Sequence, residues 1–283
     1  MTFETRFTWE KLVLELKLLR NEDFDALMPL SIGINSVLWP RENVETCFRQ
    51  VQFMAFELSQ KCESLNEAER WERLREFLFK ERQFHISNNR IKDVEDRDLL
   101  IKCILDERCG HPLPVVFLIL HMAQFLDLPI ALLQARHHFL LKWVRSGKTL
   151  YMDLYNEGRP LTDHELIQVL NRTASNLEVW SAKQLMAQYL ELLMHAFERA
   201  QALSQLHVVY NLLLQMDDTN TSVLGQRALL RQKLGFNRDA LSDLKRYFSF
   251  VERAEAPTEL QQAWVELRAV PEPPPRAPTD ILH

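Results

Sequence analysis

Residues 109–153 decide the fold of this chain, and they read CGHPLPVVFLILHMAQFLDLPIALLQARHHFLLKWVRSGKTLYMD. The apolar run 112–126 begins with a proline, which a first helical turn tolerates because its N–H would be unpaired there anyway. Segments 130–133, 139–144 and 149–155 are rich in apolar and aromatic residues between polar breaks, which is typical of strands. This stretch therefore predicts one central helix followed by a short antiparallel sheet.

A two-residue Ser-Gly turn at 146–147 suits the hairpin between the second and third of these strands. The register that this turn sets places His138 on the same face as Asp153, as diagonal neighbours about 7–8 Å apart between backbones. His137 then points to the other face, so the hairpin selects His138 as the partner of Asp153. A three-residue loop would shift the register and remove this selection.

The composition is that of a folded soluble protein with much helix. The chain has 283 residues, enough for one large domain or two of ordinary size. Hydrophobic residues make up 47%, glycine is scarce, and Leu, Glu, Arg and Gln are abundant, which favours helix over an all-β fold. A net charge of −5 without a block of like charges argues against nucleic acid as a partner.

Neither a membrane nor an oxidising compartment is indicated. The apolar run 112–126 is shorter than the roughly 20 residues that span a bilayer, and the first residues lack the basic start and apolar run of a secretory signal. The four cysteines show no C-x-x-C pair and no regular spacing, which disfavours a zinc site or a disulfide framework. We therefore expect reduced thiols and a cytoplasmic location.

The pattern of apolar residues divides the chain into four regions. Residues 1–92 carry apolar residues at helical spacing and predict a helical N-terminal region. Residues 93–175 hold the central helix and the sheet. Residues 176–255 predict two helical hairpins, and residues 256–283 are rich in proline, which predicts an extended and mobile tail.

The two predicted hairpins have the character of a repeat. The segment ALLRQKLGFNRDALSDLKRYF at 228–248 is similar to a tetratricopeptide repeat, whose period is about 34 residues. A weaker repeat covers roughly residues 185–218. Two units are few for an independent solenoid, so we expect them to pack on the core domain. Within the tail, residues 261–267 could form a last helical turn or two.

Cys109, His138 and Asp153 are the candidate catalytic residues, in the chain order of a thiol site. A thiol becomes a useful nucleophile when a helix N-terminus or an imidazolium lowers its pKa. The histidine would accept and return the proton, and the aspartate would fix its tautomer. Cys109 nevertheless lies about one turn ahead of the helix, whose opening residues 112–114 include no nucleophile. The alternatives are a small buried cysteine beside a turn and a structural histidine.

Two further residues could contribute to binding near this site. His111 could supply polarity next to Cys109, in a loop that we expect to be exposed. Arg159 could bind an anion, and the alternative is a solvated arginine that follows a turn. His121 lies on the apolar helix and is interpreted as a core histidine. No His or acidic pair has the spacing of a zinc site, so neither a metal nor a cofactor is predicted.

Taken together, these residues resemble the bacterial SirB family, whose members join a transglutaminase-like core to C-terminal tetratricopeptide-type repeats. The resemblance covers about residues 20–255. It rests on an arginine-x-glycine-x-proline motif, a glycine-histidine-phenylalanine-leucine segment, an aspartate and a glycine-arginine turn. The matching residues are Arg108, Gly110, Pro112, His138, Phe139, Leu140, Asp153, Gly158 and Arg159. Two positions depart from the pattern: His137 replaces the expected glycine, and many relatives carry a residue such as threonine where this chain has Cys109.

The resemblance implies a papain/transglutaminase-like core in a mostly α, α+β protein, and it implies the fold more firmly than catalysis. We expect a cytoplasmic interaction or regulatory protein that binds a protein or peptide partner through its repeats and the adjoining cleft. One alternative is a cysteine-dependent hydrolase or acyl transferase acting on amide bonds. Another is a scaffold without a functional cleft.

Overall fold

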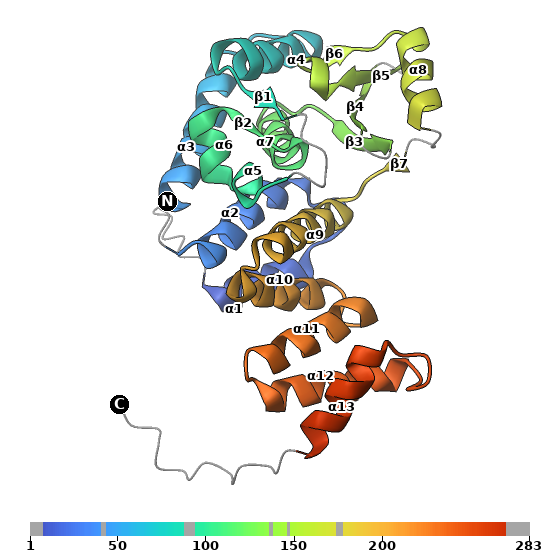
Figure 1. Ribbon diagram of the computed structural model, residues 1–283. Coiled ribbons are helices and arrows are strands. Elements are labelled where there is room, and N and C mark those ends of the chain that lie inside the picture. Colours follow the sequence, from blue (N-terminus) through green and yellow to red (C-terminus); the bar gives the residue numbers. More distant parts are fainter. Residues whose placement is uncertain are drawn as a thin grey trace. The chain divides into compact units, whose positions relative to one another are not determined.

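The computed structural model describes the chain in six stretches, residues 8–40, 44–87, 94–135, 138–145, 148–173 and 178–269. These stretches belong to two compact units, one up to Met216 and one from Asp217 onward. The first unit combines helices with two small sheets, and the described part of the second consists of helices (Figure 1). The predicted α+β, mostly α class is therefore confirmed. Within the described stretches, every helix is too short or too polar to span a bilayer.

The elements follow one another in an order that places most helices before and after the strands. The helices of the first unit are α1 (Trp9–Leu18), η1 (Phe24–Ala26), α2 (Leu27–Leu38), α3 (Val44–Gln60), α4 (Glu67–Arg75), the π-helix η2 (Glu76–Glu81), α5 (Asp96–Leu99), α6 (Ile101–Glu107), α7 (Pro112–Phe125), the 3₁₀ turn η4 (Leu154–Asn156), α8 (Asp163–Thr173), α9 (Ala182–Ala200) and α10 (Leu203–Met216). Its strands are β1 (His85–Ile86), β2 (Cys109–Gly110), β3 (Ile130–Ala135), β4 (His138–Arg145), β5 (Lys148–Asp153), β6 (Arg159–Pro160) and β7 (Glu178–Val179). The second unit contains α11 (Thr221–Lys233), α12 (Asn237–Phe250) and α13 (Thr258–Ala269).

Helix α7 forms the centre of the first unit. Residues 112–123 are all buried, because the helix packs against α2, α3, α9 and β3. A helix that is apolar on all sides belongs in a core and not at a surface. The central helix predicted from the apolar run is confirmed.

A buried polar network ties the neighbours of α7 together. The Tyr189 hydroxyl on α9 donates to the Leu99 carbonyl at 2.9 Å and accepts a hydrogen bond from the Asn35 amide at 2.8 Å. The Asn35 carbonyl oxygen in turn accepts from the Ile101 N–H at 2.8 Å. Because these buried polar groups satisfy one another, they fix the positions of α2 and α9 on the turn between α5 and α6.

The larger sheet has five strands in the order β6-β5-β4-β3-β7, and all of its pairs are antiparallel. Arg145 pairs with Lys148, so the predicted register of the second and third strands is confirmed. The turn residues 146–147 themselves lie outside the described residues. The predicted third strand was too long. It ends at Asp153 and not at residue 155, because the chain turns into η4 directly afterwards. Position 155 therefore has no strand partner opposite His138.

Several elements were missing from the sequence prediction. A parallel two-residue pair joins β1 to β2, with His85 opposite Cys109. Helices α2 and α8 were also missed. Helix α8 begins at a visible signal, since Thr162 accepts a hydrogen bond from the Glu165 N–H and Glu165 accepts one from the Thr162 N–H. This reciprocal pair is a capping box.

The predicted tail begins with a regular helix. Helix α13 packs on α11 and α12 and buries Leu260, Ala263 and Leu267. The helical turns expected at residues 261–267 are therefore confirmed, within a longer helix. The expectation of an extended tail from residue 256 is wrong for the rest of Thr258–Ala269, because apolar residues at helical spacing pack on α11 and α12. The remainder, residues 270–283, lies outside the described residues.

The two predicted helical hairpins are present, but they fall in different units. Helices α9 and α10 pack on each other and on α2 in the first unit, as expected for hairpins that rest on the core. Helices α11 and α12 form the second hairpin and join α13 in the second unit. The boundary between the units at residues 216–217 thus divides the predicted 176–255 region.

Candidate functional site

A histidine caps the N-terminus of helix α7. His111 is the N-cap of the helix, and its Nδ1 accepts a hydrogen bond from the Leu113 N–H at 3.2 Å. The backbone N–H of His111 donates to the backbone carbonyl of Asp98 at 2.9 Å. The imidazole and the Phe139 ring form an edge contact with a centroid distance of 6.3 Å. The side chain is only 5% exposed, so the expectation of an exposed loop is wrong.

Burial keeps this imidazole neutral. It lowers the pKa of His111 to about 4, and the charge of Asp98 opposes the shift only in part. A neutral ring whose Nδ1 accepts a hydrogen bond carries its proton on Nε2. His111 at neutral pH is therefore a capping group with a fixed tautomer and not a cation that could stabilise a thiolate.

Cys109 lies on β2, two residues before that cap. Gly110 between them has no room for a side chain, because an added Cβ would lie 2.4 Å from Cγ1 of Ile104. The residue is exposed, yet partial burial of the thiol raises its pKa, and the charges of Asp98 and Glu107 raise it further. This direction is opposite to the one that a catalytic thiolate needs.

Asp153 is a buried carboxylate at the end of β5, 5% exposed. Its Oδ1 accepts from the Tyr155 N–H at 3.0 Å, and its Oδ2 accepts from the Asn156 amide at 2.6 Å. The charge of Asp153 and above all burial raise the pKa of Tyr155 to about 12. The predicted need for a partner is thus met in part by the turn that follows the strand.

That turn depends on Gly158. Its φ of +65° is one that side chains rarely adopt, and an added Cβ would lie 3.1 Å from the Trp71 ring. The Gly158 N–H donates to the Asp153 carbonyl at 2.8 Å. Because glycine alone takes this conformation at little cost, it holds the turn closed under Asp153 and against α4.

Arg159 on β6 already has a counter-ion. It pairs with Glu165 at 2.6 Å. Hydrogen bonds from Arg159 and Thr162 lower the pKa of Glu165 to about 2. This pair uses one nitrogen of the guanidinium group, and the predicted anion-binding role of Arg159 stays a prediction.

The fold brings most of these residues to one end of the sheet. Asp153 pairs with Leu140 on β4, and His138 begins that strand two positions earlier, opposite Ala135. Phe139, between His138 and Leu140 on β4, contacts His111 at the start of α7. The side chain of His138 lies outside the described residues, so its catalytic role and that of Cys109 stay predictions.

This arrangement, a central helix that begins beside an antiparallel sheet, agrees with the comparison to known families. Residues 45–205, more than half of the chain, match the model of the transglutaminase-like superfamily. The chain belongs to the transglutaminase-like superfamily. In this family member the matched region contains α7, the strands from β1 to β7, and the hairpin of α9 with the start of α10.

Two curated relatives are similar over part of the chain. They are UPF0162 proteins of Xylella fastidiosa, from strains Temecula1 and 9a5c, and are 27% and 26% identical over 174 residues. Each match covers 57% of this chain and 61% of the relative. The transglutaminase-like chain thus spans about three fifths of the length of the curated relatives that it matches.

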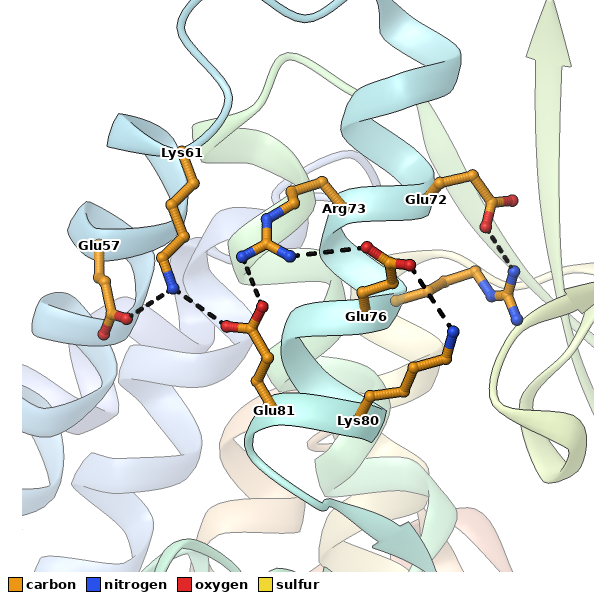
Figure 2. A network of polar contacts seen from close by, with 8 residues as sticks. Glu57, Lys61, Glu72, Arg73, Glu76, Lys80 and Glu81 are labelled. Atoms are coloured by element: carbon orange, nitrogen blue, oxygen red, sulfur yellow. Dashed lines mark hydrogen bonds and ion pairs between the residues drawn. The ribbon is translucent and has the colours of Figure 1, made fainter.

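An open groove of about 360 Å³ runs along α4 of the transglutaminase-like core. It is lined by Leu65, Ala68, Glu69, Glu72, Arg73 and Glu76. Figure 2 shows three of these side chains: Glu72 and Arg73 from α4, and Glu76 from the π-helix that continues it. Arg73 pairs with Glu81 at 2.5 Å and with Glu76 at 3.6 Å. The groove therefore has a mainly apolar lining with acidic side chains along it.

Other residues of α4 contact strand β4 and the turn that follows Asp153. The Trp143 indole on β4 donates to Glu67 at 2.6 Å, and Arg75 donates to the Glu157 carbonyl at 2.7 Å. A bond to the Asp153 turn thus starts from the same helix that lines the groove. No local sequence pattern indicates these two contacts, because they join residues more than 70 positions apart.

The described residues offer no site for a metal ion. No group of three or more His, Cys, Asp or Glu side chains in them is arranged to hold one. The polar residues that sequence reasoning missed are Tyr155 and Asn156. An aspartate at a strand end, followed three residues later by asparagine, is a turn signal that could have found Asn156.

Proposed function

We propose that this chain is a cytoplasmic interaction or regulatory protein in which a divergent transglutaminase-like core binds a segment of a partner protein. The arrangement is that of the SirB-type family, with α9–α10 and α11–α12 as tetratricopeptide-like hairpins. The partner segment would be a peptide or a helix, which grooves beside helices commonly bind.

The start of α7 carries the proposal. A thiol enzyme of this architecture would place its nucleophile there, where the helix N-terminus lowers a thiol pKa. This chain has a buried neutral histidine followed by proline at that place. Its nearest thiol, Cys109, lies on a strand and has a raised pKa. A binding role needs none of these groups to react.

The groove on α4 supports the binding role. Leu65 and Ala68 offer apolar contact, while Glu69 and Glu72 are exposed at its side. A segment that carries basic residues beside a small apolar anchor would match this surface.

Photocrosslinking in cells tests the proposal. A photoreactive phenylalanine replaces Glu72 in the groove, and in a control variant it replaces the exposed Glu10 on α1. We expect a discrete crosslinked species from the Glu72 variant that is absent from the control and is lost on Ala68→Arg. Equal labelling of both variants would contradict the groove as the binding surface.

The alternative, a cysteine-dependent hydrolase or acyl transferase acting on amide bonds, rests on the family and on the register. Asp153 lies opposite Leu140, two positions from His138 on the same strand. This alternative expects an acyl-enzyme on Cys109 with activated acyl donors. Cys109→Ser would abolish that species. If the variant keeps its fold but loses activity, the enzyme alternative replaces the binding proposal.

A further inference from the structure

Arg108 has a guanidinium group that forms no ion pair with the described residues. The residue caps the end of α6 in the left-handed region, with φ 59° and ψ 22°. Its guanidinium lies over the ring of the buried Phe84, 5.0 Å from the ring centroid. Among the described residues, none forms a hydrogen bond or an ion pair with this side chain, and its Nη1 is buried without a partner. Such a group calls for a bound ion, water or ligand as its explanation.

A second arginine with an unpaired nitrogen lies close by. Arg82 precedes Phe84 by two residues, and its Nε is buried without a partner in the part of the chain described. The strand pair β1–β2 connects the two arginines, because the His85 N–H donates to the Arg108 carbonyl at 2.7 Å. Burial is the main cause that lowers the pKa of Arg108, and the positive charge of Arg82 lowers it further, while the charge of Asp106 opposes the shift.

The carboxylates of α6 near Arg108 are engaged elsewhere. Asp106 pairs with Lys102 at 2.7 Å, and Glu107 pairs with Arg97. These pairs join residues along the surface of α5 and α6. Within the described stretches, no carboxylate therefore contacts Arg108.

The carboxylate that pairs with Arg82 is shared with another cation. Glu57 pairs with Arg82 and with Lys61, the latter at 3.0 Å. From Lys61 the ion pairs continue through Glu81 to Arg73 (Figure 2). In this series of ion pairs, Glu57 and Glu81 each contact two cations. The negative charge of Glu57 is therefore divided between Arg82 and Lys61.

We propose that Arg108 and Arg82 together bind an oxyanion, the phosphate or carboxylate group of a ligand. A guanidinium presents its N–H donors in a planar fork that matches such a group, often with two parallel hydrogen bonds. The left-handed backbone of Arg108 is the kind of local strain that functional sites retain. This site differs from the end of the sheet and does not depend on the proposed function.

Calorimetric titration tests this site with two probes, inorganic phosphate and succinate, each in Tris chloride buffer at constant ionic strength. We expect one phosphate or succinate to bind per chain, and Arg108→Gln to weaken it by about tenfold or more, because a charge-assisted hydrogen bond is lost. Arg246→Gln is the matched control, since it removes an exposed guanidinium that pairs with Asp218. Its affinity should equal that of the unmodified protein.

The pair of probes identifies the source of the oxyanion. Phosphate binding that depends on Arg108 assigns a phosphate-bearing ligand, and succinate binding that depends on it assigns a carboxylate. Arg108→Lys keeps the charge but loses the fork, so it should bind with intermediate affinity, and it decides the matter if Arg108→Gln melts below room temperature. The proposal is overturned if neither probe binds, or if the Arg108 variants and Arg246→Gln bind equally well.

Discussion

Two regions of this protein differ in how their partly buried arginines are paired. In the hairpin of α11 and α12, Asp243 is 5% exposed and accepts hydrogen bonds from Arg227 at 2.7 and 2.9 Å and from Arg231 at 2.7 Å. Around β1 and β2, Arg108 and Arg82 keep buried nitrogens without partners in the described stretches. One region contains a carboxylate between two guanidinium groups, and the other has none in contact with Arg108.

The difference separates a structural arginine from a candidate ligand-binding one. A buried charge is costly unless it is paired and hydrogen-bonded. The α11–α12 hairpin pairs both of its arginines with Asp243. In the β1–β2 region Arg82 shares Glu57 with Lys61, and Arg108 pairs with no carboxylate of the described residues. Unsatisfied groups in an otherwise well-packed protein mark the places where something other than stability shaped the structure.

The largest loss of stability is expected when the carboxylate between Arg227 and Arg231 is removed. Asp243→Asn leaves two guanidinium groups without their carboxylate, so it should lower the free energy of unfolding by roughly 3–5 kcal/mol. Urea unfolding followed by circular dichroism measures the change. Asp239→Asn on the exposed side of the same helix is the control, and it should cost less than about 1 kcal/mol. Equal effects of the two substitutions would show that the triad is not what stabilises this hairpin.

The next effect concerns two histidines of the first unit. Burial lowers the pKa of His111 and of His121 to about 4, from 6.5. Below pH 6.5 the unfolded chain therefore binds protons that the folded protein excludes. Stability is fully present above that pH and falls by about 1.4 kcal/mol per pH unit for each histidine as the pH drops toward 4.

Unfolding in urea at pH 7, 6 and 5 measures this dependence. His111→Asn keeps a side chain suited to the N-cap but does not titrate, so it should remove about half of the slope between pH 6 and 5. A flat stability profile in the unmodified protein over this range would contradict the burial of the two neutral rings.

A smaller effect on stability is expected from removing one arginine in each of the two regions. Arg227→Gln should destabilise by about 2 kcal/mol because Asp243 loses its bidentate partner. Arg108→Gln removes a guanidinium that forms no hydrogen bond or ion pair with the described residues, so without a ligand it should change stability by less than about 1 kcal/mol. Thermal melts of both variants in phosphate-free buffer give the two values. A larger loss for Arg108→Gln than for Arg227→Gln would reverse the assignment of the two regions.

The sequence predicted the parts of the fold that depend on local signals. The apolar run with its opening proline indicated α7, and the Ser-Gly turn set the β4–β5 register that places Leu140 opposite Asp153. Contacts between distant segments escaped it. The β1–β2 pair is only two residues long, too short for any periodic pattern.

The candidate site was predicted less completely than the fold. His111 precedes a proline at the first helical position, and this N-cap signal could have predicted its role as a capping group. The bond from Arg75 to the Glu157 carbonyl and the unpaired nitrogens of Arg82 and Arg108 have no local signal at all. They follow from how helices and strands far apart in sequence pack together.

The reactivity of Cys109 tests the central claim that this transglutaminase-like core binds and does not react. Alkylation of the native protein over a range of pH, read for each cysteine by mass spectrometry, measures the thiol pKa directly. The account predicts that Cys109 reacts half-maximally above the ordinary thiol pKa of about 8.5, and that His138→Ala leaves its rate unchanged. Fast alkylation well below pH 8 that is lost on His138→Ala would contradict the account and favour a thiol enzyme.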